Sequence, residues 1–129
     1  MNFTVYGDPI SKARPRLGKG GNVYTPPATK QAEFLIQQAF RFDSDRTKLD
    51  GPVSLSVYFC FKMPKRLKGK PEPHIVVPDL DNLVKTVKDA LNGLAYWDDA
   101  QVTDIHAFKR YTTGKPRTEI TIEPATTGY

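Results

Sequence analysis

The sequence predicts an α+β fold in which two main helices pack on a small mixed β-sheet, and three observations indicate it. Strand-like and helix-like segments follow one another in the order strand, helix, strand, short extended run, helix, strand, strand, which is typical of helices packed on one sheet. The 129 residues suit one domain, residues 1–129. Hydrophobic residues make up 39% and charged residues 26%, as in a globular protein.

The N-terminal half contains two strands and a helix. Residues 2–7 are apolar and β-branched and end at a glycine, which indicates a first strand. Residues 8–27 form a long basic loop, a length typical of functional or mobile segments. Residues 28–42 carry apolar side chains near helical spacing. Residues 51–62 alternate strictly between apolar and small or polar side chains, so we expect a strand with one buried face.

The C-terminal half contains a short extended run, a helix and two strands. Residues 74–77, "HIVV", are a brief β-like run stopped by a proline. The helix is predicted over 81–92, with an asparagine and a glycine at its end. Residues 101–113 and 117–125 are predicted to form a hairpin that turns at Gly114. The apolar stripe of the helix faces either the sheet or a partner, and its members are Leu83, Val84, Val87, Leu91 and Leu94.

Positive charge is clustered in two loop-like stretches of a chain with net charge +5. The first stretch carries Lys12, Arg14, Arg16 and Lys19. The second carries Lys62, Lys65, Arg66, Lys68 and Lys70. Either cluster alone is explained by solubility, but two together favour a polyanion such as nucleic acid, because phosphates attract clustered Lys and Arg. We expect DNA contacts from Lys12, Arg14, Arg16, Lys19, Lys65, Arg66 and Lys68.

Several protein classes are disfavoured by the composition. No apolar run approaches the roughly 20 residues of a membrane span, and no secretion signal opens the chain, so a cytoplasmic location without membrane contact is expected. Cys60, the single cysteine, is predicted to be a buried small side chain. His74 and His106 are isolated and give no zinc-site spacing.

Against this basic background, residues 79–104 form an acidic island with six aspartates, two lysines and a net charge of −4. If the chain stays extended up to Asp81, the carboxylates of Asp79 and Asp81 project to one side. We therefore expect the helix to begin near Asp81, which is a good N-cap residue. The segment "LAYWDD" is long enough to run back along the helix and bring Asp98 or Asp99 beside this pair.

Three converging carboxylates would suit Mg²⁺ or Mn²⁺ and metal-assisted attack of water on a phosphodiester. Each residue also has a plain structural interpretation. Asp81 can be only an N-cap, or only the i,i+4 partner of Lys85. Asp98 and Asp99 can form a simple turn. A D-x-D pair alone is weak, since sugar transferases share it.

The stretch "PDLDNLVKTVKDALNGLAYWDDAQV" closely resembles the signature of the RusA family of Holliday junction resolvases, and the opening "GDPISKARPR" resembles the family's basic start. The resemblance implies a homodimeric, Mg²⁺-dependent endonuclease, for which Mn²⁺ is expected to substitute, that nicks four-way DNA junctions symmetrically in recombination or repair. Its essential carboxylates fall on Asp79, Asp81 and Asp99, with Asp98 adjacent, and its essential lysine falls on Lys85. Val77 departs from the basic residue that family members often carry before P-D. Such proteins are frequently encoded by phages.

Three hypotheses remain at this point. The first is a junction endonuclease. The second is a non-catalytic DNA-binding protein in which the island only caps and turns, and it would keep its function in EDTA. The third, a Mn²⁺-dependent sugar transferase, is disfavoured because the chain is short and shows no nucleotide-sugar domain.

Overall fold

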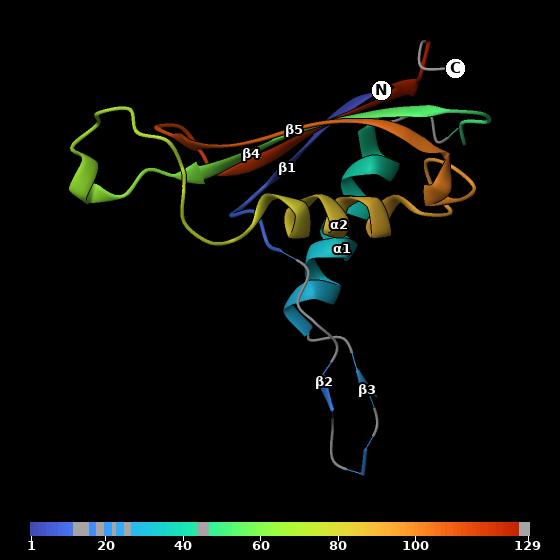
Figure 1. Cartoon of the computed structure of the whole chain (residues 1–129), viewed down its shortest axis with the longest axis horizontal. Coiled ribbons are helices and arrows are strands. Elements are labelled where there is room, and N and C mark those ends of the chain that lie inside the picture. Colours follow the sequence, from blue (N-terminus) through green and yellow to red (C-terminus); the bar gives the residue numbers. More distant parts are fainter. Residues whose placement is uncertain (12–15, 18–19, 22, 25–26, 44–46, 127–129) are drawn as a thin grey trace.

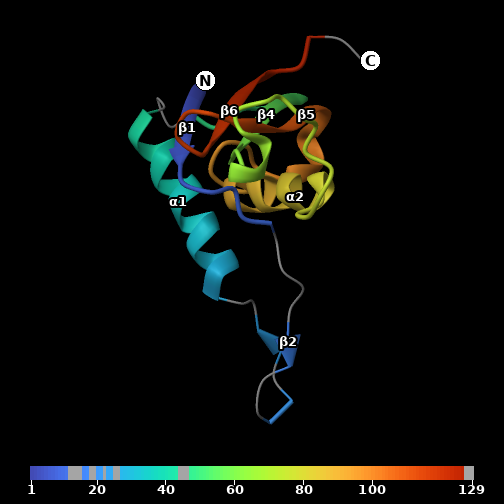
Figure 2. The ribbon, with the colours of Figure 1, turned by 90° about the vertical axis from the view of Figure 1, so that its left-hand side faces the viewer.

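The computed structural model describes residues 1–11, 16–17, 20–21, 23–24, 27–43 and 47–126. It is an α+β fold with two main helices packed on a mixed sheet, as predicted; the sheet has four strands, and both helices lie on the same face of it (Figure 1). The view turned by 90° shows the sheet as the upper layer and both helices below it (Figure 2).

The main sheet contains β1 (Asn2–Tyr6), β4 (Val53–Lys62), β5 (Val102–Thr112) and β6 (Arg117–Pro124), in the order β1-β6-β4-β5. β6 pairs antiparallel with β1 and β4, whereas β4 and β5 are parallel. The predicted hairpin of the last two strands is therefore wrong, because β4 lies between β5 and β6. A parallel pair needs a long crossover connection, and the segment containing the second helix supplies it.

The helices are α1 (Pro27–Asp43) and α2 (Leu80–Leu91). Both lie close to their predicted positions, and α1 opens on a proline, whose fixed φ suits a first helical turn. Most of the apolar stripe of α2 is buried in the core of its own chain, so it faces the sheet rather than a partner. Its buried members are Leu83, Val84, Val87 and Leu91.

The core lies between the helices and the covered face of the sheet. Register places Leu55 of β4 beside Ile122 of β6 and Val57 beside Ile120, so the predicted alternation of β4 produces one continuous apolar layer. Phe3 of β1 adds an edge-on contact with Phe40 of α1, with ring centroids 5.8 Å apart.

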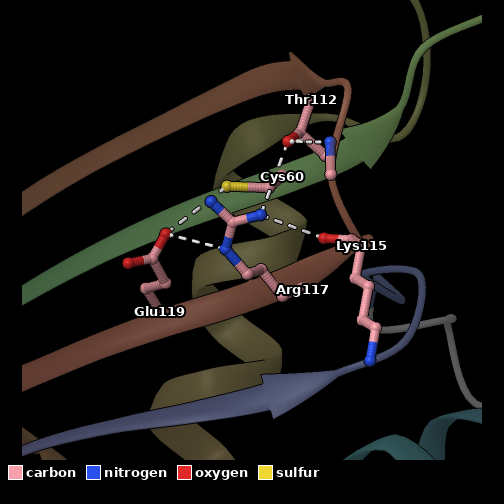
Figure 3. Close-up of polar contacts among 6 residues, drawn as sticks. Cys60, Thr112, Lys115, Arg117 and Glu119 are labelled. Atoms are coloured by element: carbon pink, nitrogen blue, oxygen red, sulfur yellow. Dashed lines mark hydrogen bonds and ion pairs between the residues drawn. The ribbon is translucent and has the colours of Figure 1, made fainter.

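The uncovered face of the sheet carries polar side chains around Cys60 (Figure 3). Arg117 Nε donates to Glu119 Oε2 at 3.1 Å, and the Cys60 thiol lies 3.8 Å from the same oxygen. Arg117 also reaches Lys115 O at 3.0 Å, which ties the loop after β5 to β6. Cys60 is buried as predicted, and this burial raises the pKa of its thiol and keeps it protonated.

Two segments differ from the sequence prediction. Within the expected loop 8–27, β2 (Arg16–Leu17) and β3 (Val23–Tyr24) pair antiparallel as a small second sheet. Gly20 and Gly21 lie between these strands with φ of 84° and 83°, values that glycine adopts readily. Residues 74–77 form no strand. Within the described residues, no helix is long and apolar enough to cross a membrane.

Candidate functional site

The N-terminal end of α2 presents two of the predicted carboxylates. Asp79 is the N-cap residue, with an extended backbone (φ −71°, ψ 142°), and the helix begins at Leu80. The predicted start near Asp81 is thus late by one residue, and Asp81 belongs to the first turn. The Asp79 side chain makes no capping hydrogen bond, so its oxygens are not used to cap the start of the helix.

Asp81 and Lys85 are exposed on α2, one turn apart. No ion pair within 4.0 Å connects these two described residues, so the plain i,i+4 interpretation does not account for them. The Asp79 and Asp81 carboxylates and the Lys85 ammonium therefore face solvent, where an ion or a phosphate can reach them.

A lysine that the sequence analysis missed fixes the chain that enters this site. Lys109 Nζ donates to Val76 O at 2.6 Å and to Pro78 O at 2.9 Å, immediately before Asp79. Lys109 pairs with Phe59 in the β4–β5 register, so it lies on the helix-covered face of the sheet. The sequence signal that could have identified Lys109 is a charged residue at an inward-facing position of a predicted strand. We call residues 75–78 the strap.

His74 anchors the start of the strap. Its ring is buried between Phe61 and Tyr111, with centroid distances of 4.4 Å and 4.6 Å. Burial, and then the charge of Lys109, lower the pKa of His74, which keeps the imidazole neutral at neutral pH. The strap is therefore held by ring packing at one end and by charged hydrogen bonds at the other.

Asp98 and Asp99 lie at the opposite end of α2. The Asp99 amide donates to Asn92 Oδ1 at 3.1 Å, and Asn92 is the C-cap residue of the helix. The expectation that residues 93–99 run back along the helix is therefore wrong. Ala95 and Tyr96 are fully buried, and Tyr96 OH donates to Lys88 O at 2.9 Å, so the segment is a packed turn and not an extended tether.

Asp98 has a structural task in that turn. Its Oδ1 accepts from Ala100 N at 3.0 Å, and Gln101 Oε1 accepts from Asp98 N at 2.9 Å, which forms a capping box at the short helix η2 (Asp99–Gln101). The Ala100 amide, and to a smaller extent Asp99, lower the pKa of Asp98. Gln101 Nε2 also donates to Leu49 O and Gly51 O, so this loop is fixed to the chain before β4.

Asp99 is half-buried beside this turn. Burial, and then the charges of Asp99 and Asp89, raise the pKa of the Tyr96 hydroxyl above its usual value. The 12 residues of α2 rise about 18 Å, which separates Asp99 from the pair at the other end. Among the described residues, no group of three or more His, Cys, Asp or Glu side chains is arranged to hold a metal.

The second basic cluster, apart from Lys62 at the end of β4, forms an exposed loop after that strand. Leu67 of the short helix η1 (Lys65–Leu67) is buried and anchors it, while Lys65 and Lys68 are exposed. Arg66 pairs with Glu72 at 3.0 Å, an acid just beyond the cluster. Lys12, Arg14 and Lys19 lie outside the described residues, and Arg16 is described only as the first backbone position of β2.

Comparison with known proteins gives two findings. A family model described as "Endodeoxyribonuclease RusA" matches residues 6–123. The chain is also 38% identical, over 135 aligned positions, to a protein of Bacillus subtilis (strain 168) described as "Uncharacterized protein YqaN". That alignment covers 95% of this chain and 94% of the relative.

Proposed function

The chain belongs to the RusA family of endodeoxyribonucleases, and from that premise we propose that it is a divalent-metal-dependent nuclease that resolves four-way DNA junctions by paired nicks. The observation that supports this best is the group at the start of α2. Asp79 and Asp81 point two carboxylates into solvent, and Lys85 follows one turn later without an ion pair to Asp81. Among the described residues, these two carboxylates make no capping hydrogen bond or ion pair that would give them a role in stabilising the fold.

The donor set at this end of α2 fits a hard cation. Carboxylate oxygens are the ligands that Mg²⁺ prefers, usually one or two of them together with water, and Mn²⁺ accepts the same donors. Asp79 and Asp81 would hold the ion, with Asp99 as a third acid and Asp98 next to it. When bound, Mg²⁺ supplies Lewis-acid polarisation of a phosphoryl oxygen and lowers the pKa of coordinated water.

Lys85 is proposed to act on the substrate. An ammonium one turn from Asp81 can donate to a non-bridging phosphate oxygen and offset the charge that develops there. The exposed Lys65 and Lys68, together with the first basic cluster, Lys12, Arg14, Arg16 and Lys19, are proposed to contact other phosphates. Arg66 lies in the same loop, but its guanidinium already forms an ion pair with Glu72, so its contact with a phosphate is expected to be weaker.

A homodimer is proposed on both substrate and chain geometry. Two nicks in strands of like polarity are matched by two sites related by a two-fold axis. Within one copy, Asp99 lies at the far end of a helix about 18 Å long. A second copy whose α2 runs antiparallel to the first would bring its own Asp99 to Asp79 and Asp81, and the same operation would complete the second site.

A junction-cleavage assay separates this function from the second candidate, a binder without catalysis. That candidate is favoured by the capping box of Asp98, which shows that part of the acidic island is structural. Labelled four-way junction and matched linear duplex are incubated with Mg²⁺ or EDTA. We expect symmetric nicks in the junction only with Mg²⁺, and binding that persists in EDTA. Binding without nicks at any Mg²⁺ or Mn²⁺ concentration would favour the binder.

A further inference from the structure

The strap presents three consecutive apolar side chains to solvent beside the proposed site. Ile75 is 83% exposed, Val76 51% and Val77 79%. Single exposed apolar residues are ordinary on protein surfaces, but a run of three such residues is unfavourable in water unless it serves a contact. The side chains are also β-branched and therefore stiff at χ1.

The backbone under these side chains is held firmly at both ends. Lys109 Nζ donates to the carbonyls of Val76 and Pro78, at 2.6 Å and 2.9 Å. At the other end, His74 is packed between two aromatic rings. An unanchored apolar loop would fold onto the protein surface, whereas this one keeps its side chains directed away from the core.

The surroundings indicate which partner the strap meets. Val77 and Asp79 are two residues apart, so their Cα atoms lie within about 7.6 Å, or roughly two base steps along one DNA strand. The chain before the strap carries the exposed Lys65 and Lys68, which suit a phosphate backbone. Apolar contact flanked by cations and by phosphate-directed residues is the chemistry of a DNA surface whose bases are partly unstacked.

We propose that Ile75 and Val77 form an apolar wedge that enters an unstacked base step next to the nicked phosphate, with Lys109 as the residue that holds the wedge in position. This rests on the proposed function, since it takes DNA as the substrate of the same site. Insertion of Ile, Leu or similar side chains between base steps is a known way to distort DNA, and the junction branch point, where stacking is interrupted, is the least costly place for it.

The test uses base unstacking, which requires binding but not cleavage. A four-way junction with 2-aminopurine at the branch point is bound in EDTA by the full chain and by Ile75→Ser/Val77→Ser. We expect a several-fold rise in 2-aminopurine fluorescence with the wild-type chain and little with the double variant. Phe42→Ser, which changes an 88% exposed aromatic on α1, is the matched control and should behave as wild type.

The nicking assay provides the second measurement. With Mg²⁺, the double variant should nick a fully paired junction at least about tenfold more slowly, because it must unstack the step without the wedge. Two unpaired nucleotides at the branch point should restore its rate to within about threefold of wild type. A merely misfolded variant would not show this rescue, and both changed side chains are exposed.

Three outcomes would overturn the wedge. The wild-type chain could bind the junction without a fluorescence change, or the double variant could match wild type on paired junctions. The third outcome is an oligomeric state of the double variant that differs from that of the wild type in light scattering. It would show that the apolar run is a contact between copies of the chain. In each of these outcomes the wild-type chain still nicks junctions with Mg²⁺, so failure of the wedge is distinguishable from failure of the proposed function.

Discussion

At the residue scale, the aspartates of the acidic island differ in whether their carboxylates are already used. Asp98 accepts a capping hydrogen bond, whereas Asp79 occupies a cap position without making one. The residue type alone could not separate them, because Asp is favoured at caps, turns and metal sites alike. The D-x-x-Q spacing of Asp98 and Gln101 was the signal for its structural task.

This difference gives the first prediction. Asp79→Asn and Asp81→Asn should each abolish nicking, because an amide is a weaker ligand than a carboxylate, while junction binding stays equal or tightens as repulsion from phosphates decreases. Asp98→Asn should retain most activity, since Asn caps as well as Asp. Single-turnover nicking and a gel-shift assay in EDTA measure the two effects. If the Asp79→Asn variant nicked junctions at the wild-type rate, Asp79 would not belong to the proposed site.

The second prediction concerns Lys85, which has no ion pair to Asp81 to lose. Lys85→Ala should leave thermal unfolding and junction binding nearly unchanged, yet nicking should fall at least about a hundredfold, the scale of one lost electrostatic donor. Lys85→Arg should also lose much activity, because a guanidinium differs in shape and donor geometry. Lys88→Ala, on the same helix, serves as the control. If Lys85→Ala nicks at the wild-type rate, Lys85 is only a surface residue.

At the element scale, the strap shows where local sequence preference misleads. Residues 75–77 are β-branched, which predicted a strand over 74–77, yet no described strand pairs with them. Their geometry is instead set by two distant contacts, from His74 to Phe61 and from Lys109 to the strap carbonyls. By contrast, α1, α2 and β4 were predictable within about two residues, because each has a strong periodicity of its own.

The third prediction tests whether the strap positions Asp79. Lys109→Met keeps the side-chain length but removes both hydrogen bonds, which should cost about 1–3 kcal/mol of unfolding free energy. Because Asp79 follows directly, the Mg²⁺ concentration for half-maximal nicking should rise several-fold. Lys109→Arg, which can still donate twice, should restore much of the Mg²⁺ dependence. A Lys109→Met chain that is less stable but has an unchanged Mg²⁺ requirement would show that Lys109 only supports the fold.

At the scale of the whole molecule, the fold class and the element order were predictable, but the neighbours in the sheet were not. β5 and β6 follow one another with a short connection, which favoured a hairpin, yet β4 pairs with both. Strand choice is a non-local property that depends on the whole core. The position of Asp99 is also a non-local property. The burial of Ala95 and Tyr96 holds Asp99 at the C-terminal end of α2, away from Asp79.

The last prediction follows from that separation. If Asp99 of one copy completes the site formed by Asp79 and Asp81 of another, an Asp79→Asn chain and an Asp99→Asn chain should complement each other. In a mixed dimer, one composite site carries both changes and the other carries neither. Equal mixing of the two inactive chains after denaturation and refolding should therefore restore nicking, but only of one strand per junction. About half of the dimers in a random mixture are of this kind.

If each chain instead forms its site alone, every site in the mixed dimer has one change, and no activity returns. Mixing Asp79→Asn with Asp81→Asn is the control, since both residues lie at the same end of α2 and should not complement in either arrangement.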